Sequence, residues 1–192
     1  MKKTSLLALL FVFSAAMILT NSCEKVKDLT SFDVRLKAPE HRFTLDSAGM
    51  PLKSTATETL FTYQLVNVNI DSILQSNGIS SATISNGGLT DVVLAIVLPA
   101  GTTFDWLSSA RAVASLTLEG LATGTQIAHT ATIAPGSTSV NLVLDNAAIT
   151  QFINNNNFYI GVYGTLLGPL PTTTLTCTLN STFTFTVNPL GE

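Results

Sequence analysis

The sequence contains few of the side chains on which catalysis or metal binding depends. It has two histidines, His41 and His129, and nucleophilic catalysis needs such a base beside its nucleophile. His129 falls on the apolar phase of a strand pattern with Ile127 and Ala131, so we expect a core or edge histidine rather than a catalytic base. Neither a Gly-x-Ser-x-Gly turn nor a Gly-Lys-Ser/Thr phosphate loop occurs. Two histidines and two cysteines give no metal-ligand spacing, so the sequence predicts no metal site.

Acidic side chains are the remaining candidates for acid–base or calcium chemistry. Paired carboxylates catalyse glycoside hydrolysis, and the body of the chain offers Asp71, Asp91, Asp105, Glu119 and Asp145. Helix starts and strand ends explain four of these five carboxylates without catalysis. Residues 154–157 are a dense cluster of asparagine oxygens, but they lack the calcium-loop pattern and predict a plain turn. The sequence therefore predicts a protein that is not an enzyme and has no cofactor.

Three aromatic residues are candidates for ligand binding. Tyr159 and Tyr163 share one face of a predicted strand with Gly161 between them, and two rings that flank a flat gap suit stacking on a sugar. Trp106, the only tryptophan, lies in a predicted surface turn beside Asp105. Packing under a loop or across strands is the alternative interpretation of all three side chains.

The last segment of the chain, residues 174–187, has the most regular pattern. Apolar residues occupy one parity and threonines the other, which predicts one buried and one half-exposed face. The threonine face could dock another strand or an ordered ligand, or could simply be an exposed sheet surface. Cys177 lies on the apolar parity with no base or cation near it in sequence, so we expect a buried small hydrophobe rather than a reactive thiol.

The N-terminus carries a targeting pattern. Lys2 and Lys3 precede an apolar run over residues 6–19, whose 14 residues are too few for a membrane-spanning helix but suit a secretory signal. Ser22 and Cys23 follow shortly after this run. The arrangement resembles the lipobox of a bacterial lipoprotein, with Thr20 at the position where that family prefers leucine.

The resemblance implies that a peptidase removes residues 1–22 and that lipid on Cys23 anchors the mature chain to a membrane. More than one acyl chain holds a protein stably to a bilayer. Glu24 is not the aspartate that retains some lipoproteins at the inner membrane, so we expect the outer membrane, at its periplasmic or surface face. Cleavage near residues 14–16, giving a secreted protein, and an uncleaved anchor are the alternatives.

Charge is scarce in most of the chain. Only 11% of the 192 residues are charged, 46% are hydrophobic, and the mean hydropathy is +0.41. Arg111 is the only Lys or Arg after residue 60. A nucleic-acid binder needs a basic footprint that this chain lacks, so we expect a membrane, an envelope protein or a glycan as partner.

Turn signals rich in glycine and proline recur every 8–14 residues through the body of the chain. This spacing is typical of an all-β sandwich or barrel. We expect an antiparallel, immunoglobulin-like β-sandwich with one or two short helices. The predicted organisation is a signal peptide (residues 1–22), a lipid-anchored tether (23–31) and a β-sandwich domain (32–192).

Individual strands can be placed within this sandwich. Residues 32–38 predict a first strand, and the polar stretch 39–58 predicts a long loop with a short strand around 43–45. The continuous apolar run over residues 89–98 predicts a central strand buried on both faces. The final segment predicts either one long strand or a hairpin bent at residues 180–181.

Short helices are expected at two places. Asn69 could cap a helix over residues 70–77, with Gly78 as its stop. Asp145 or Asn146 could cap a second helix over residues 147–153. Residues 104–107 predict a further single turn.

Three functions fit these patterns. The first is a non-enzymatic, lipid-anchored envelope protein that acts as an interaction or structural module. The second is a carbohydrate-binding surface lipoprotein that uses Tyr159, Tyr163 and Trp106. The third is a fibre or adhesin subunit that assembles by strand donation, as the long final segment would allow.

Overall fold

The computed structural model describes residues 31–49, 58–145 and 149–189. The predicted signal peptide, Cys23 and all of the predicted tether except Ser31 lie outside the described residues. In the part of the chain that is described, no helix is long and apolar enough to span a membrane.

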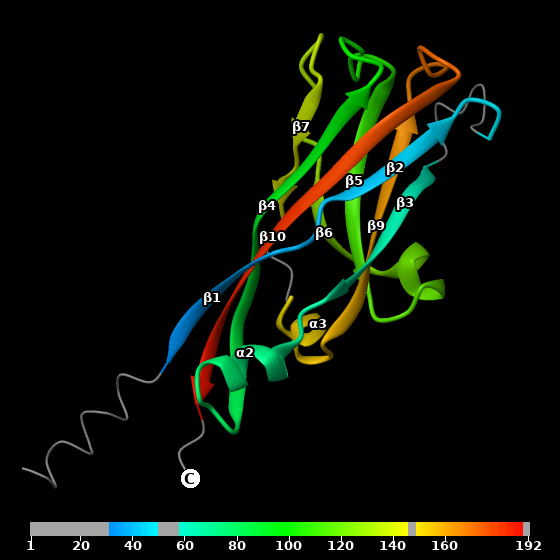
Figure 1. The fold of residues 1–192 in the computed structure, drawn as a ribbon. Coiled ribbons are helices and arrows are strands. Elements are labelled where there is room, and N and C mark those ends of the chain that lie inside the picture. Colours follow the sequence, from blue (N-terminus) through cyan, green and yellow to red (C-terminus); the bar gives the residue numbers. More distant parts are fainter. Residues whose placement is uncertain (1–30, 50–57, 146–148, 190–192) are drawn as a thin grey trace, which may run out of the picture.

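Two antiparallel sheets pack face to face (Figure 1). In sheet A the order is β1-β10-β4-β7, and β2 joins by pairing with β10. Its strands are β1 (Phe32–Lys37), β2 (His41–Asp46), β4 (Ala82–Leu98), β7 (Ser139–Asn141) and β10 (Thr174–Pro189). In sheet B the order is β3-β9-β5-β6-β8. Its strands are β3 (Thr59–Asn67), β5 (Leu107–Ser115), β6 (Thr125–His129), β8 (Val143–Leu144) and β9 (Asn157–Leu166).

The connections between these strands define the fold. The chain passes from β2 in sheet A to β3 in sheet B, returns to A with β4, and reaches B again with β5. It crosses to A for β7, back to B for β8 and β9, and ends in A with β10. Such crossing between two antiparallel sheets is the connectivity of a jelly roll. The predicted all-β antiparallel sandwich is confirmed, and it is immunoglobulin-like in the broad sense of two packed sheets.

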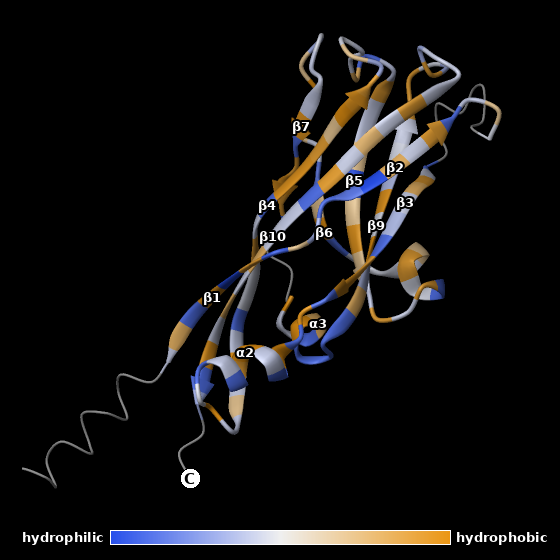
Figure 2. Cartoon of the chain, in the orientation of Figure 1, coloured by the Kyte–Doolittle hydropathy of each residue, from blue (hydrophilic) through white to orange (hydrophobic). Residues whose placement is uncertain are grey.

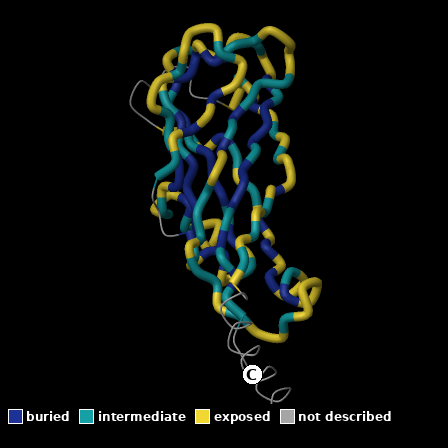
Figure 3. The backbone as a smooth tube through the Cα atoms, turned by 90° about the vertical axis from the view of Figure 1, so that its left-hand side faces the viewer, coloured by how far each residue is buried: buried dark blue, intermediate teal, exposed yellow. Residues whose placement is uncertain are grey.

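In the described part of the chain, three short helical segments lie in the connections. They are α2 (Ile70–Ser76) between β3 and β4, the 3₁₀ helix η1 (Glu119–Thr123) between β5 and β6, and α3 (Thr150–Asn154) between β8 and β9. Figure 1 places α2, α3, the start of β1 and the end of β10 towards one end of the sandwich. The β4–β5, β6–β7 and β9–β10 loops form the opposite end, where Figure 3 shows mostly exposed backbone.

The helix α2 begins where the sequence predicts and ends one residue earlier, at Ser76. The Asn69 side chain accepts a hydrogen bond of 3.3 Å from the Ser72 amide and so satisfies a donor of the first turn. Ile70 and Leu74 are buried on one side of the helix. Gly78, just past its end, has φ of +69°, a conformation that glycine adopts without steric cost.

The second helix is present where the sequence predicts it, but the predicted capping by Asp145 is wrong. The described helix α3 covers Thr150–Asn154, and no side chain caps it at Ile149. The Asp145 carboxylate instead binds side chains of β6, so an Asp145 cap is wrong. Asn146, the alternative cap, lies outside the described residues.

The final segment is one strand, so the hairpin alternative is wrong. β10 is 16 residues long and pairs with β1 and β2 along one edge and with β4 along the other. Its apolar parity is buried as predicted, and Figure 2 shows the alternation of apolar and polar residues along it. The threonine face is less open than predicted. Thr178 and Thr182 are only 4% and 7% exposed because neighbouring strands flank them on both sides.

The strand that contains residues 89–98 is longer than predicted and buried on one face only. Val92 and Leu94 are 1% exposed and point into the sandwich. Val93 and Ala95 are half-buried, and Leu98 is 53% exposed. The prediction of burial on both faces is wrong because the alternate residues lie on the outer face of sheet A.

The first strand is confirmed as β1, and the short strand predicted around residues 43–45 is present as the slightly longer β2, while residues 50–57 of the predicted loop lie outside the described residues. β2 covers His41–Asp46 and continues the edge of sheet A along β10. Between the two strands, the Ala38 amide donates to the Ser181 carbonyl over 3.0 Å, so the edge is nearly continuous. Phe43 and Leu45 face inward while Arg42 and Asp46 face outward, which is the alternation of an edge strand.

Phenylalanines connect the two sheets in the core. Phe158 of β9 meets Phe183 of β10 edge-on, with ring centroids 5.5 Å apart, and packs against Phe152 of α3 at 5.7 Å. Phe158 and Phe183 are fully buried. Burying one such side chain stabilises a fold by roughly 1.5–3 kcal/mol, so these contacts tie α3 and the two sheets into one unit.

Candidate functional site

The structure separates Trp106 from the two tyrosines. Trp106 is 6% exposed, and its ring packs against Phe104 and Phe61 at centroid distances of 5.8 and 6.0 Å. The predicted turn is present, since the Leu107 amide donates to the Phe104 carbonyl over 2.9 Å. The turn dips into the core, however, so the prediction of a surface tryptophan is wrong. Trp106 is not placed to stack on a ligand.

The two tyrosines lie on the outer face of sheet B as predicted. Tyr159 and Tyr163 are half-buried on β9, and the residues between them on the opposite parity point into the core. The flat gap expected at Gly161 is filled, because Leu121 of η1 covers it. A side chain at Gly161 would lie 3.2 Å from the Leu121 methyls. The tyrosines therefore flank an apolar ridge instead of an open gap.

Tyr63 is a surface aromatic residue that the sequence reasoning missed. It is 46% exposed on β3 and meets Tyr159 edge-on, with ring centroids 6.4 Å apart. Leu60 and Leu65 of the same strand are 38% and 53% exposed. The alternation in β3 could have indicated this face, but a bulge between Leu60 and Thr62 shifts its phase.

A row of side chains crosses sheet B beside this aromatic patch. Paired residues on five neighbouring strands form it: Leu60, Tyr163, Arg111, His129 and Val143. The guanidinium of Arg111 lies over the Tyr163 ring, 4.8 Å from its centroid. Such cation–π stacking fixes the position of the charged group.

Arg111 also forms an ion pair with Glu58. Its Nε lies 2.8 Å from both carboxylate oxygens, and Nη2 lies 2.8 Å from Oε2. The hydrogen bond to Glu58 raises the pKa of Arg111 above its ordinary value. Arg111, the only Lys or Arg after residue 60, is thus held between a tyrosine ring and a carboxylate.

His129, on the same row, is paired with Asp145. His129 Nδ1 lies 3.0 Å from Oδ1 of Asp145, and the Gln126 amide donates to Oδ2 over 3.0 Å. The prediction that His129 shares the buried phase of Ile127 is wrong. The register between β5 and β6 shifts at Ala112/Val113, which buries both Ile127 and Ala128 and turns His129 outward.

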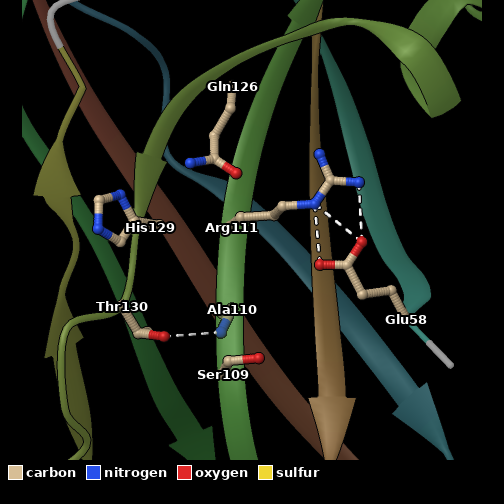
Figure 4. A pocket seen from close by; sticks show the side chains of 7 residues that line it. All are labelled: Glu58, Ser109, Ala110, Arg111, Gln126, His129 and Thr130. Carbon is tan, nitrogen blue, oxygen red and sulfur yellow. Dashed lines mark hydrogen bonds and ion pairs between the residues drawn. The ribbon is translucent and has the colours of Figure 1, made fainter. Parts of the chain in front are cut away.

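A polar hollow lies between these two pairs (Figure 4). Its volume is about 230 Å³, and its lining residues are Glu58, Ser109, Ala110, Arg111, Gln126, His129 and Thr130. Figure 4 shows His129 on one side and the Arg111–Glu58 pair on the other. On the floor, the Ala110 amide donates to Thr130 Oγ1 over 3.0 Å. No single segment of the sequence indicates this hollow, because its residues come from β5, from β6 and the residue after it, and from the residue before β3.

The other candidates for chemistry are buried or already bonded. Cys177 is 1% exposed, and burial raises the pKa of its thiol to about 12, as expected of a small hydrophobe. Thr186 of the threonine face donates to Asp33 over 2.7 Å. Within the described ranges, no group of three or more His, Cys, Asp or Glu side chains could hold a metal ion.

Comparisons with known proteins identify no relative from which function can be transferred. No protein-family model matches the chain, and no curated protein matches it. Among solved structures, the chain is similar to a decameric BFDV capsid protein, with a TM-score of 0.43 and 9% sequence identity. That alignment covers 82% of this chain and 99% of the capsid chain. At this TM-score the similarity carries no conclusion about function.

Proposed function

We propose that this chain is a non-enzymatic, lipid-anchored protein of the bacterial cell envelope that acts by binding, through the outer face of sheet B. The signal-like N-terminus and Cys23 support the anchor. Phe32, the first residue of β1, follows Cys23 by nine positions. An extended tether of that length spans at most about 30 Å, so the sandwich stays close to the bilayer.

The observation that carries the binding surface is the exposed patch on β3 and β9. Leu60, Tyr63 and Leu65 all expose more than a third of their surface on one strand, and Tyr159 adjoins them. Contiguous apolar surface of this kind, rimmed by polar groups, marks interaction sites. The polar rim is present in the hollow at Arg111 and His129.

Carbohydrate is the ligand class that this surface favours. Sugar rings present apolar faces that stack on aromatic side chains and hydroxyls that need hydrogen-bond partners. The outer face of sheet B offers both, with Tyr63 and Tyr159 beside a hollow lined by charged and amide groups. A protein partner on the same patch is the second candidate, supported by Leu60 and Leu65.

Strand donation receives no support from the same structure. The hypothesis rested on the long final segment and on a detachable leader, and β10, which is that final segment, has paired neighbours along both edges. Donor-strand assembly requires an open groove beside such a strand. We therefore keep binding, not polymerisation, as the proposed role.

The test is binding of the full-length lipoprotein in detergent to a glycan array. We expect binding to at least one glycan class and at least tenfold weaker binding in the variant Tyr63→Ala/Tyr159→Ala, because the stacking surface is lost. Leu167→Ala is the matched control, since this side chain is 62% exposed but lies in the β9–β10 loop. No binding to any glycan would remove the carbohydrate proposal, and glycan binding that survives the double substitution would show that Tyr63 and Tyr159 do not contact the ligand. Mass spectrometry of the mature N-terminus tests the anchor, and an unacylated start at any other residue would contradict it.

A further inference from the structure

We infer that the hollow between Arg111 and His129 binds a single uncharged sugar ring through its hydroxyls. This inference rests on the proposed function and assigns the ligand chemistry of one part of that surface. Three observations carry it: the charge balance of the hollow, its unused hydrogen-bonding groups and its size.

The charge balance disfavours an anionic ligand. The positive charge of Arg111 is compensated by Glu58 at 2.8 Å. On the other side of the hollow, the lining residue His129 is paired with the Asp145 carboxylate over 3.0 Å. A carboxylate or phosphate would have to displace Glu58 or approach Asp145, and like charges at such distances repel strongly. A neutral ligand meets neither penalty.

The hydrogen-bonding groups suit hydroxyls. Counting only bonds among described residues, Nη1 of Arg111, Oε1 of Gln126 and Nε2 of His129 have no partner. Their other polar atoms are held by Glu58 or Asp145, so the unused atoms have fixed directions. A hydroxyl donates and accepts at once and can bond to either type of group. The Ser109 and Thr130 side chains add two further hydroxyls to the lining.

The Arg111 side chain is ordered before any ligand arrives. The Tyr163 ring covers one face of the guanidinium, whose carbon lies 4.8 Å from the ring centroid. Glu58 forms an ion pair with the edge of the guanidinium. A site whose side chains are already fixed loses little conformational entropy on binding. Tyr163 is therefore a positioning residue for Arg111, and Tyr63 and Tyr159 are the aromatic residues left to contact adjoining rings.

The size limits the ligand to one ring. The volume of about 230 Å³ is below the range of roughly 300–1,000 Å³ for drug-sized ligands. A longer glycan would place one ring in the hollow and extend its neighbours over the outer face of sheet B.

Calorimetry on the full-length lipoprotein in detergent tests this inference. The probes are galactose, glucose and mannose oligosaccharides, each paired with an oligosaccharide of its uronic acid. We expect at least one neutral oligosaccharide to bind, and its uronate counterpart to bind at least tenfold more weakly. We also expect Gln126→Ala and Arg111→Lys each to weaken the neutral ligand about tenfold, since each removes a fixed hydrogen-bonding group.

The matched control is Gln75→Ala, the same substitution at an exposed position of α2. It should bind like the unsubstituted chain. Three results would overturn the inference, and they are distinguishable. Neutral binding lost in Tyr63→Ala/Tyr159→Ala but unchanged in Gln126→Ala and Arg111→Lys places the sugar on the tyrosines alone and leaves the proposed function intact. Tighter binding of the uronate refutes the neutral ligand. No binding of any oligosaccharide removes both the inference and the carbohydrate proposal.

Discussion

Arg111 illustrates what residue types alone reveal at the scale of single side chains. The sequence marks it as the sole cation of the body, yet its partner Glu58 lies 53 positions away. Tyr163 and His129 reach it only through strand pairing. Residue type thus identifies an unusual charge, while the fold decides what that charge contacts. Cys177 is the opposite case, because its apolar neighbours in sequence already predict its burial.

The burial of Cys177 predicts that its thiol is unreactive in the folded protein. Its pKa of about 12 means that the reactive thiolate forms only in strongly alkaline solution. At pH 8 we expect no reaction of the native chain with a disulfide reagent and complete reaction in 6 M guanidinium. If Cys23 carries lipid through its sulfur, the denatured full-length chain gives one thiol, not two. Rapid reaction of the native protein would contradict the burial, and two thiols would contradict the lipid.

At the scale of elements, alternation predicts a strand well where no bulge interrupts it. β10 keeps one parity buried from Leu175 to Val187, and its pattern was sufficient to predict its faces. β3 and the β5–β6 pair each contain a register shift. Because a shift of one residue moves side chains to the opposite face, Tyr63 and His129 could not be placed from parity. The burial of Trp106 could not be predicted for another reason: the sequence indicates a turn, but a turn can fold towards the core as easily as towards solvent.

The loops at the far end of the sandwich are joined by Asp105. Its Oδ1 accepts a hydrogen bond of 2.8 Å from the Gly136 amide, and this bond connects the β4–β5 loop to the β6–β7 loop. Its Oδ2 accepts a hydrogen bond of 2.8 Å from the Thr103 hydroxyl within the β4–β5 loop. These hydrogen bonds lower the pKa of Asp105 below its ordinary 3.8. The contact therefore favours the folded state above that ordinary pKa and is lost as the pH falls through the lower, folded value.

We expect the amide chemical shift of Gly136 to report this titration by NMR, with a midpoint below 3.8. Asp105→Asn should abolish the titration while the spectrum of the strands stays unchanged, since only the loop contact is altered. A midpoint at or above the ordinary value would show that the carboxylate is not held by the β6–β7 loop.

For the whole molecule, strand order was beyond prediction because the pairing is long-range. Asp33 and Thr186 are hydrogen-bonded although they are 153 residues apart. Composition and turn spacing define a class of two-sheet sandwiches, but no local pattern selects which strands become neighbours. The two ends of the sandwich therefore differ in their distance from the start of the first strand. The start of β1 and α2 lie at one end, and the β9–β10 loop lies at the other (Figure 1).

Lipid anchoring should therefore orient the sandwich on a bilayer. We predict that a fluorophore at Gln75→Cys on α2 is quenched by headgroup-labelled lipid more strongly than one at Leu167→Cys in the β9–β10 loop. Both positions are exposed, and buried Cys177 does not compete for the label. The same labels on a Cys23→Ala chain, which cannot be anchored, should show no quenching. Equal quenching at the two positions of the anchored chain would refute the orientation.

The pairing of β1 with β10 also has a mechanical consequence. In the proposed lipid-anchored chain, the first strand after the lipid is an edge strand, and six residue pairs from Phe32↔Val187 to Lys37↔Thr182 attach it to β10 in sheet A. When a ligand on sheet B holds the sandwich and the membrane pulls away, tension enters at Phe32 and runs along β1. All six pairs then share the load in shear, whereas a pull across the strand would open them one at a time. In the proposed anchored chain, the hydrogen bonds between β1 and β10 would thus bear the load in parallel.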